Sequence, residues 1–278
     1  MFTVKKVKKP ILKTAEEIEQ LRRSAQLVSK TFAVLKEHVR PGVSTAFLDR
    51  LAETFIRDHG AIPAFKGYQP DKSTIPFPGT LCTSVNEAVV HGVPSEEVIL
   101  KEGDIVSLDC GVVLDGYIGD SAYTFAVGEV SEQVQRLLDV TKESLYLAIA
   151  QVKRGARVGD ISFAVQRHVE SHGYSVVREL VGHGVGRSLH EPPEVPNYGK
   201  RGHGPLLTEG VVICIEPMIN MGRADVVRAK DGWTILAKDR KPSAHFEHTV
   251  AIGPTGADVL TTFEPIETGA SLEPQNAL

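Results

Sequence analysis

The sequence has few cysteines and no long apolar run. Its three cysteines, Cys82, Cys110 and Cys214, are far apart and never form a CxxC pair. This spacing excludes a zinc knuckle and argues against a disulfide framework, so we expect reduced thiols and a cytoplasmic location. No apolar run approaches the roughly 18–20 residues of a membrane span. The basic N-terminus, MFTVKKVKKP, lacks the apolar stretch of a signal peptide.

The chain also lacks a strong excess of either charge. Its 278 residues carry a formal net charge of −4. This balance gives no electrostatic reason to expect a nucleic acid or an anionic membrane as the main partner. With 42% hydrophobic residues, the chain is long enough for one large domain or two small ones with a proper core.

A helical pattern occurs four times along the chain. Thr14-Ala-Glu-Glu17 has the form of a capping box, and apolar residues follow it at helical spacing at positions 18, 21, 25, 28, 32 and 35. The Pro-Gly pair at positions 41 and 42 should end this helix. The other three helices are expected from about Ser44 to His59, from about Ser131 to Arg154, and from a cap at Asp160 to Gly173.

The two pairs of helices are related by an offset of 113 residues. With this offset, Val39, Gly42, His59 and Gly60 recur as Val152, Gly155, His172 and Gly173. Strand-like segments follow each pair. The order of two helices followed by strands thus occurs twice. It predicts one α+β domain made of two related halves, about 14–130 and 131–263. Residues 1–13 form a short basic lead, and the polar stretch 264–278 is expected to be a loose tail.

Two acidic residues lie on one face of a predicted hairpin. Segment 104–127 contains Asp115-Gly116 between two strand-like runs, which is a strong hairpin signal. With these two residues as the loop, position 111 faces 120 and position 109 faces 122, and all four side chains share a face. Asp109 and Asp120 then lie diagonally across the strand pair, with Cα atoms roughly 7–8 Å apart. Two carboxylates at that distance can converge on a common cation.

Glu216 and Glu247 repeat this arrangement in the second half. Each is an acid in a strand-like segment, VVICIEPMI (211–219) or SAHFEHTVAIG (243–253), and a polar connection containing Trp233 separates the two expected strands. An acid in a strand can also lie on the solvent face or in an ion pair. However, no lysine or arginine adjoins any of the four acids, and a buried carboxylate is costly unless its charge is compensated. The pattern therefore favours a metal site.

Three histidines lie beside glycines or turns. His183 lies between glycines in VGHGVGRSLHEPPEVPNYG (181–199), His190 precedes a Glu-Pro-Pro turn, and His91 ends the strand-like run AVVHGVP. For each of them alone, a structural or exposed role is the alternative. No HExxH pattern occurs, which excludes a helical zinc-protease site. The other histidines, including the pair that flanks the acid of SAHFEHTVAIG, are assigned no role.

The chain resembles the type I methionine aminopeptidases, which have the pita-bread fold, from about residue 14 to 262. The matching segments are TSVNEAVVHGVP (83–94), GDIVSLDCGVVLDGYIGDSAYTFAVG (103–128), ESLYLAI (143–149), SVVRELVGHGVGRSLHEPPEVPNYG (175–199), ICIEPMIN (213–220) and DGWTILAKDRKPSAHFEHTV (231–250). The resemblance implies a duplicated helix-helix-strand-strand fold around a central antiparallel sheet. It also implies a cytoplasmic metallopeptidase, a hydrolase that performs N-terminal methionine excision.

The family's metal ligands correspond to five residues, all of which are present. They are Asp109, Asp120, His183, Glu216 and Glu247. In this family the residues equivalent to Asp120 and Glu247 bridge two divalent ions. The equivalent of Asp109 chelates one ion, and those of His183 and Glu216 complete the other. Four carboxylates balance the charge of two dications, and four oxygen ligands with one imidazole suit Mn²⁺, Fe²⁺, Co²⁺ or Zn²⁺.

The resemblance further implies catalytic roles. Two ions about 3.5–4 Å apart can share a water, lower its pKa and deliver hydroxide to a carbonyl. Glu216 is then the general base and proton carrier. His190 donates to the oxyanion or the scissile amide, and His91 contacts the peptide backbone beyond the scissile bond. The methionine pocket corresponds to five residues, for which plain core is the alternative reading: Phe65, Tyr68, Phe77, Cys82 and Trp233.

The sequence departs from the family at this pocket. Many bacterial members carry cysteine in place of Phe65 and an aromatic residue in place of Leu189. Residues 69–73 form an insertion between Tyr68 and Phe77. The loop that borders the pocket is therefore expected to differ from the family pattern.

Two other classes of protein share this fold. Xaa-Pro-type peptidases usually carry a large extra N-terminal domain, and non-catalytic binding modules have typically lost ligands that are present here. We therefore expect the N-terminal peptides of nascent proteins as substrates of a monomeric enzyme. No membrane or specific nucleic-acid partner is expected. The basic lead is the candidate for contact with ribosomal RNA.

Overall fold

The structure, a computed structural model, describes residues 9–70, 72 and 74–269. Most of the basic lead, Asp71 and Ser73 of the insertion, and residues 270–278 of the expected tail lie outside the described residues. The helices are α1 (Ala15–Lys36), α2 (Thr45–Asp58), α3 (Glu132–Ile149), α4 (Val158–Ser171) and α5 (Glu264–Glu267). The strands are β1 (Ile62–Pro63), β2 (Leu81–Val85), β3 (Ala88–Val90), β4 (Ile105–Leu114), β5 (Tyr117–Ala126), β6 (Ser175–Val176), β7 (Val181–Gly184), β8 (Glu191–Pro196), β9 (Val212–Ile215), β10 (Met218–Asn220), β11 (Val226–Arg228), β12 (Ile235–Ala237), β13 (Ser243–His245), β14 (His248–Ile252) and β15 (Ala257–Val259).

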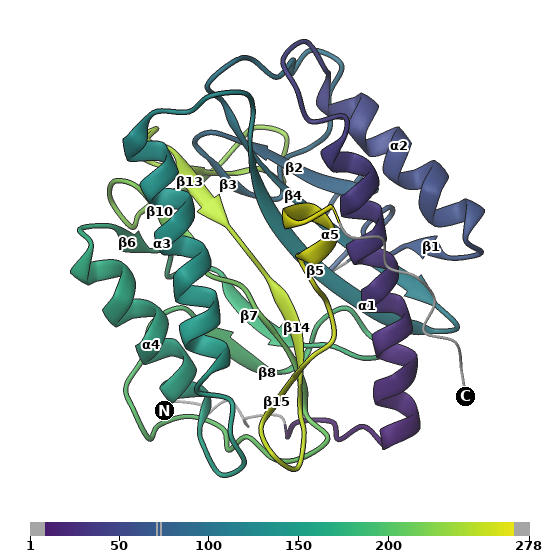
Figure 1. The fold of residues 1–278 in the computed structure, drawn as a ribbon, viewed down its shortest axis with the longest axis vertical. Helices are drawn as coiled ribbons and strands as arrows, with labels where there is room; N and C mark the ends of the chain where they lie inside the picture. Colours follow the sequence, from purple (N-terminus) through teal and green to yellow (C-terminus); the bar gives the residue numbers. More distant parts are fainter. Residues whose placement is uncertain (1–8, 71, 73, 270–278) are drawn as a thin grey trace.

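The helices and strands form the α+β arrangement expected from the sequence. Helices α1 and α2 lie beside one half of the strands and α3 and α4 beside the other, with α5 between α1 and α3 (Figure 1). The strands pair antiparallel in four groups, of which the largest has the order β15-β14-β9-β7-β8. Among the described residues, no helix combines the length and the apolar character that crossing a membrane requires.

Helix α1 begins with the predicted capping box and covers the first hairpin. Thr14 Oγ1 accepts a hydrogen bond from the backbone of Glu17, whose carboxylate accepts one from the backbone of Thr14. The apolar stripe of the helix is buried at Leu21, Ala25, Val28, Phe32 and Leu35. Each large apolar side chain so buried contributes roughly 1.5–3 kcal/mol to folding.

Close contact of α1 with β5 requires a glycine. A β-carbon on Gly119 would lie 2.3 Å from the backbone nitrogen of Ala25. The backbone of the helix therefore lies directly on the strand at this point.

Helices α3 and α4 differ from the sequence prediction at their ends. Helix α3 ends at Ile149 rather than Arg154. The chain leaves the helix after this residue, and Gly155 donates a backbone hydrogen bond to the carbonyl of Leu207. Helix α4 begins at Val158, and Asp160 is its third residue rather than its cap. The Asp160 carboxylate instead accepts a hydrogen bond from the backbone of Arg157 at 2.8 Å.

Equivalent contacts relate the two halves of the chain. Gly42 and Gly155 have φ angles of 88° and 87°. Each donates a backbone hydrogen bond to a distant leucine, Gly42 to Leu100 at 2.8 Å and Gly155 to Leu207 at 3.2 Å. The residues that match at the 113-residue offset thus occupy corresponding structural positions, which supports the prediction of two related halves.

The hairpin β4–β5 has the predicted register. Asp109 pairs with Ala122, and Gly111 pairs with Asp120. The Asp115-Gly116 turn determines this pairing, so Asp109 and Asp120 share one face of the hairpin.

In the second half, each expected strand is broken at an acid. The segment 211–219 forms β9 and β10 with Glu216 and Pro217 between them, and β13 and β14 are likewise separated at Glu247. Pro217 has no N–H with which to continue a ladder. The polar connection contains two strands that were not predicted, β11 and β12, and β12 pairs with β3 of the first half.

Hydrogen bonds join the two halves beside the acids. The backbone N–H of Glu247 donates to the carbonyl of Ala122 at 2.9 Å. Ser121 Oγ donates to the carbonyl of Glu247 at 2.6 Å, and Thr249 Oγ1 donates to the carbonyl of Asp120 at 2.7 Å. These bonds fix β5 against the chain around Glu247, so acids from both halves meet at one place.

The start of the expected tail is ordered against the domain. Residues 264–267 form α5, and Pro265 and Ile266 are buried. Lys142 on α3 donates to Glu267 at 2.9 Å. The expectation of a loose tail is therefore wrong for these four residues.

Candidate metal centre and active site

The acids and His183 converge at the junction of the two halves. One ligand atom from each of Asp120, His183, Cys214 and Glu247 lies within 4.8 Å of the others. His183 Nε2 is 3.8 Å from Asp120 Oδ2 and 3.6 Å from Glu216 Oε1. Asp109 and Glu216 line the same cavity as Asp120, His183 and Glu247. The structure thus brings together all five residues that the family resemblance assigns as ligands.

Three buried carboxylate oxygens at this junction receive no hydrogen bond from the residues that the structure describes. Within the described part of the chain, no hydrogen-bond partner reaches Asp109 Oδ1, Asp120 Oδ1 or Glu247 Oε1. Buried polar atoms are normally satisfied, and unpaired buried charges are costly. Buried carboxylate oxygens of this kind are the ligands that a divalent cation requires.

Burial raises the pKa values of the four acids at this junction. Without a cation, burial raises the pKa of Asp109 to about 7 and that of Glu216 to about 8. Burial, together with the neighbouring carboxylates, also raises the pKa of Asp120 and of Glu247 well above the usual range. A cation would reverse this effect, because it stabilises the ionised form of each carboxyl group.

His183 presents a free lone pair to these carboxylates. Its Nδ1 lies 3.0 Å from the carbonyl of Gly184, which can only accept, so Nδ1 carries the proton. Burial lowers the pKa of His183 to about 3, so the ring is neutral and Nε2 is unprotonated. The unprotonated Nε2 faces the carboxyl groups of Asp120 and Glu216, so the imidazole and these two side chains can hold one cation between them. This geometry is that of a metal-binding histidine oriented by a backbone carbonyl.

Two further side chains at the site were not predicted. His245 Nε2 lies 3.6 Å from Glu216 Oε2, and neither ring nitrogen has a hydrogen-bond partner among the described residues. Cys214 lies beside Glu247, and burial followed by the charge of Glu247 raises the pKa of its thiol. Without a cation, Cys214 is therefore a protonated thiol beside the carboxylates. The only sequence signal for either residue is its position two residues before an acid.

A cavity of about 400 Å³ extends from the acids, within the size range of small-molecule sites. All the residues expected for the methionine pocket line it, as do the two histidines that the resemblance predicts to be catalytic: Phe65, Tyr68, Phe77, Cys82, His91, His190 and Trp233. Leu189, where the sequence departs from the family, also lines it. The cavity therefore has a carboxylate end and an apolar end.

Aromatic contacts fix the apolar end of the cavity. The rings of Phe77 and Trp233 meet edge to face with centroids 5.2 Å apart. Trp233 Nε1 donates to the carbonyl of Ile75 at 2.9 Å, and Gln69 donates to the carbonyl of Thr74 at 2.6 Å. Pro70 of the insertion and Thr74, which directly follows the insertion, thus form part of the cavity wall.

His190 is held between Tyr68 and His183. The Tyr68 hydroxyl lies 2.6 Å from His190 Nδ1, and the rings of His190 and His183 are 4.4 Å apart. Burial raises the pKa of Tyr68 and lowers that of His190. Both groups are therefore neutral, and the phenol can donate to Nδ1 when the ring proton of His190 is on Nε2.

His91 has a strained backbone at the cavity wall. Its φ angle is 57°, which is unfavourable for a residue with a β-carbon. The next residue, Gly92, is held on both sides, since it accepts a backbone hydrogen bond from Thr83 and donates one to Ser84 Oγ. Burial lowers the pKa of His91 to about 4, so this ring is neutral as well.

Comparison with known proteins identifies the family. Residues 19–254 match metallopeptidase family M24. The chain belongs to this family. It is 48% identical over 254 residues to a methionine aminopeptidase of Clostridium acetobutylicum, with 91% of this chain and 99% of that protein covered. The resemblance to methionine aminopeptidases inferred from the sequence is confirmed.

Solved structures show that M24 members share the fold of this chain. A methionine aminopeptidase from Rickettsia prowazekii superimposes with a TM-score of 0.87 at 40% identity, and the match covers 91% of this chain and 100% of the other. A prolidase from Pyrococcus horikoshii gives a TM-score of 0.73 at 23% identity, and the match covers 91% of this chain and 64% of the other. The second likeness shows the fold alone. The predicted pita-bread fold is thus confirmed for this M24 chain.

Proposed function

We propose that this M24 chain is a metal-dependent aminopeptidase that removes the N-terminal methionine of newly made proteins. The observation that supports this most strongly is the convergence of four carboxylates and His183 at one end of a cavity with an apolar far end. The acidic end suits cations and a free amine. The apolar end suits a long unbranched side chain such as that of methionine, which packs readily into irregular apolar space.

Five residues are proposed to hold two divalent ions: Asp109, Asp120, His183, Glu216 and Glu247. When bound, such ions act as Lewis acids and lower the pKa of a water molecule. The donor set fits Mn²⁺, Fe²⁺, Co²⁺ or Zn²⁺, because it combines four carboxylates with one imidazole. His245 is placed to orient Glu216, since it is buried and its Nε2 faces that carboxylate.

The chain's own side chains would then move the protons. Glu216, a carboxylate that lines the cavity beside His183, is suited to accept a proton from water and pass it to the leaving amine. His190 is proposed to donate from Nε2 to the oxygen that becomes negative during attack. His91 is proposed to contact the peptide beyond the scissile bond. The aromatic wall formed by Phe77 and Trp233 would hold the methionine side chain.

Metal binding is expected to strengthen as pH rises. In the unfolded chain, aspartate and glutamate have pKa values near 4, whereas in the folded protein without a cation those of Asp109 and Glu216 are about 7 and 8. The folded metal-free protein therefore keeps protons that the unfolded chain has lost, and its stability falls as pH rises through this window. A cation displaces those protons. The increase in Tm on adding Mn²⁺ should be larger at about pH 8 than at about pH 6, and an increase independent of pH would contradict this prediction.

The substrate assignment can be tested with two peptides. Purified protein should release methionine from Met-Ala-Ser only when Mn²⁺ or Co²⁺ is present, and it should leave Ala-Pro intact. Chelator-treated protein is the control. Proline-dependent cleavage would identify an Xaa-Pro peptidase instead, and inertness under every metal condition would favour a non-catalytic binding module.

A further inference from the structure

A buried ion pair joins the segment before α1 to the loop that carries His190. Lys13 Nζ lies 2.5 Å from Glu191 Oε2, and the two side chains are only 4% and 7% exposed. Glu191 directly follows His190 and is the first residue of β8. Because both charges are buried, removing either partner leaves an uncompensated charge inside the protein.

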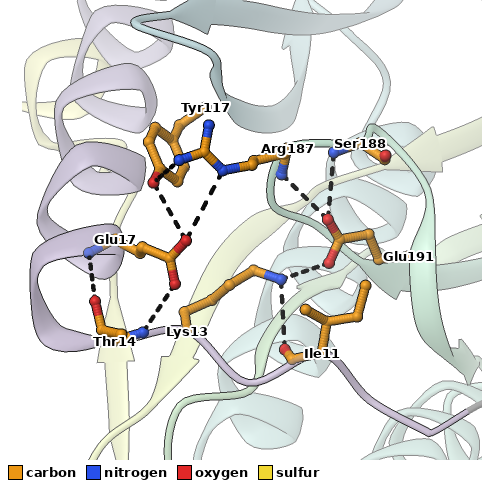
Figure 2. Close-up of polar contacts among 8 residues, drawn as sticks. All are labelled: Ile11, Lys13, Thr14, Glu17, Tyr117, Arg187, Ser188 and Glu191. Atoms are coloured by element: carbon orange, nitrogen blue, oxygen red, sulfur yellow. Dashed lines mark hydrogen bonds and ion pairs between the residues drawn. The ribbon is translucent and has the colours of Figure 1, made fainter.

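The other oxygen of Glu191 shapes the turn before His190. Glu191 Oε1 accepts hydrogen bonds from the backbone N–H groups of Arg187 at 3.1 Å and Ser188 at 3.2 Å (Figure 2). A β-carbon on Gly186 would lie 2.5 Å from Lys13 Cε. Lys13 therefore lies against the backbone of the turn. Its ammonium group holds the Glu191 carboxylate, which in turn holds the backbone of Arg187 and Ser188.

Lys13 is itself held firmly in place. Its backbone N–H donates to the carbonyl of Gly210 at 2.7 Å. Its Nζ also donates to the carbonyl of Ile11 at 3.4 Å. The capping box of α1 begins at the next residue, Thr14. The ammonium group thus projects from a fixed point between the turn and the helix.

A second contact between α1 and the turn is more exposed. Arg187 donates to the Tyr117 hydroxyl at 2.5 Å, and that hydroxyl donates to Glu17 at 3.2 Å (Figure 2). The side chain of Arg187 is 63% exposed, so solvent weakens its interaction with Glu17. The buried pair of Lys13 and Glu191 is therefore the stronger determinant of the turn's position.

We propose that Lys13 is a positioning residue for His190. Tyr68 holds one side of the imidazole, and the Lys13–Glu191 pair fixes the backbone on which the imidazole is carried. The inference rests on the proposed function, in which His190 donates to the substrate. A displacement of about 1 Å at such a donor is enough to slow a reaction by about a hundredfold.

Kinetics of substituted proteins test this role. Lys13→Met should lower kcat by about ten- to a hundredfold with little change in KM. Lys13→Arg, which keeps the charge, should restore most of the rate. In a His190→Ala background, Lys13→Met should change kcat by less than about twofold, because the residue through which it acts is gone. Lys142→Met, at the lysine paired with Glu267 on the surface, is the matched control and should leave kcat unchanged.

Amide hydrogen exchange provides a measurement that needs no activity. Lys13→Met should speed exchange at Arg187 and Ser188, whereas Lys142→Met should not. If Lys13→Met fails to fold, the neutral pair Lys13→Met/Glu191→Gln should show the same local increase. Unchanged exchange, or an equal loss of kcat with and without His190, overturns the proposal. Failure of the unmodified protein to release methionine would instead refute the proposed function, and the exchange result would still decide whether Lys13 holds the turn.

Discussion

Glu216→Gln is expected to lower kcat by roughly 10²–10⁴-fold, the range in which a general base contributes to catalysis. The side chain keeps its size, so the cavity and the break between β9 and β10 should persist. The amide cannot accept a proton from water at neutral pH, whereas an ionised Glu216 carboxylate can. Steady-state kinetics with Met-Ala-Ser and a metal analysis of the same samples would measure the effect.

The control for this substitution is Glu194→Gln, at an exposed glutamate on β8. It should leave both kcat and metal content unchanged. Some metal should remain bound to Glu216→Gln, because an amide oxygen can still act as a ligand. Near-normal turnover by Glu216→Gln would mean that another group is the base.

Asp109→Ala is expected to lower metal affinity and activity together. Outer partners of metal ligands are worth about 10–100-fold in affinity, so loss of a ligand itself should exceed about 100-fold. In the unmodified protein, Mn²⁺ at 100 times its Kd should stabilise the fold by about 2.7 kcal/mol. That increment should be much smaller in Asp109→Ala, and calorimetric titration with thermal melting would measure both quantities.

The same variant provides a second test in the absence of metal. Asp109 is a carboxyl group whose ionisation is opposed by burial, so removing it should leave the metal-free protein at least as stable as the unmodified one near pH 8. Asp225→Ala, at an exposed aspartate, is the control and should bind Mn²⁺ normally. Equal stabilisation of the unmodified protein and Asp109→Ala by Mn²⁺ would show that Asp109 is not a ligand.

Local signals in the sequence predicted the parts of the fold that local chemistry determines. The Asp115-Gly116 turn fixed the register of β4 and β5, which placed Asp109 and Asp120 on one face. The capping box at Thr14 gave the start of α1. Both features depend on residues close together in the chain, and for that reason they could be read from the sequence.

Features that depend on long-range contacts were not predicted. The break between β13 and β14 arises where Glu247 bonds to Ala122 of the other half. The contact of His245 with Glu216 depends on the pairing of β13 with β10 across a long connection. Lys13 lay in what was expected to be only a basic lead, and its partner Glu191 is 178 residues away. The four acids were predicted as a metal site from their strand patterns, whereas His183 and the individual ligand roles came from the resemblance to a family. Their convergence required the whole fold.

Crystals of the protein grown with Mn²⁺ would test the central claim most directly. Anomalous scattering from manganese should give two peaks within bonding distance of the carboxylates and His183: Asp109, Asp120, Glu216 and Glu247 should all have an oxygen in contact with a peak. Manganese bound only elsewhere on the surface, with these four side chains paired to one another or to water, would contradict the proposed metal centre and the hydrolytic function built on it.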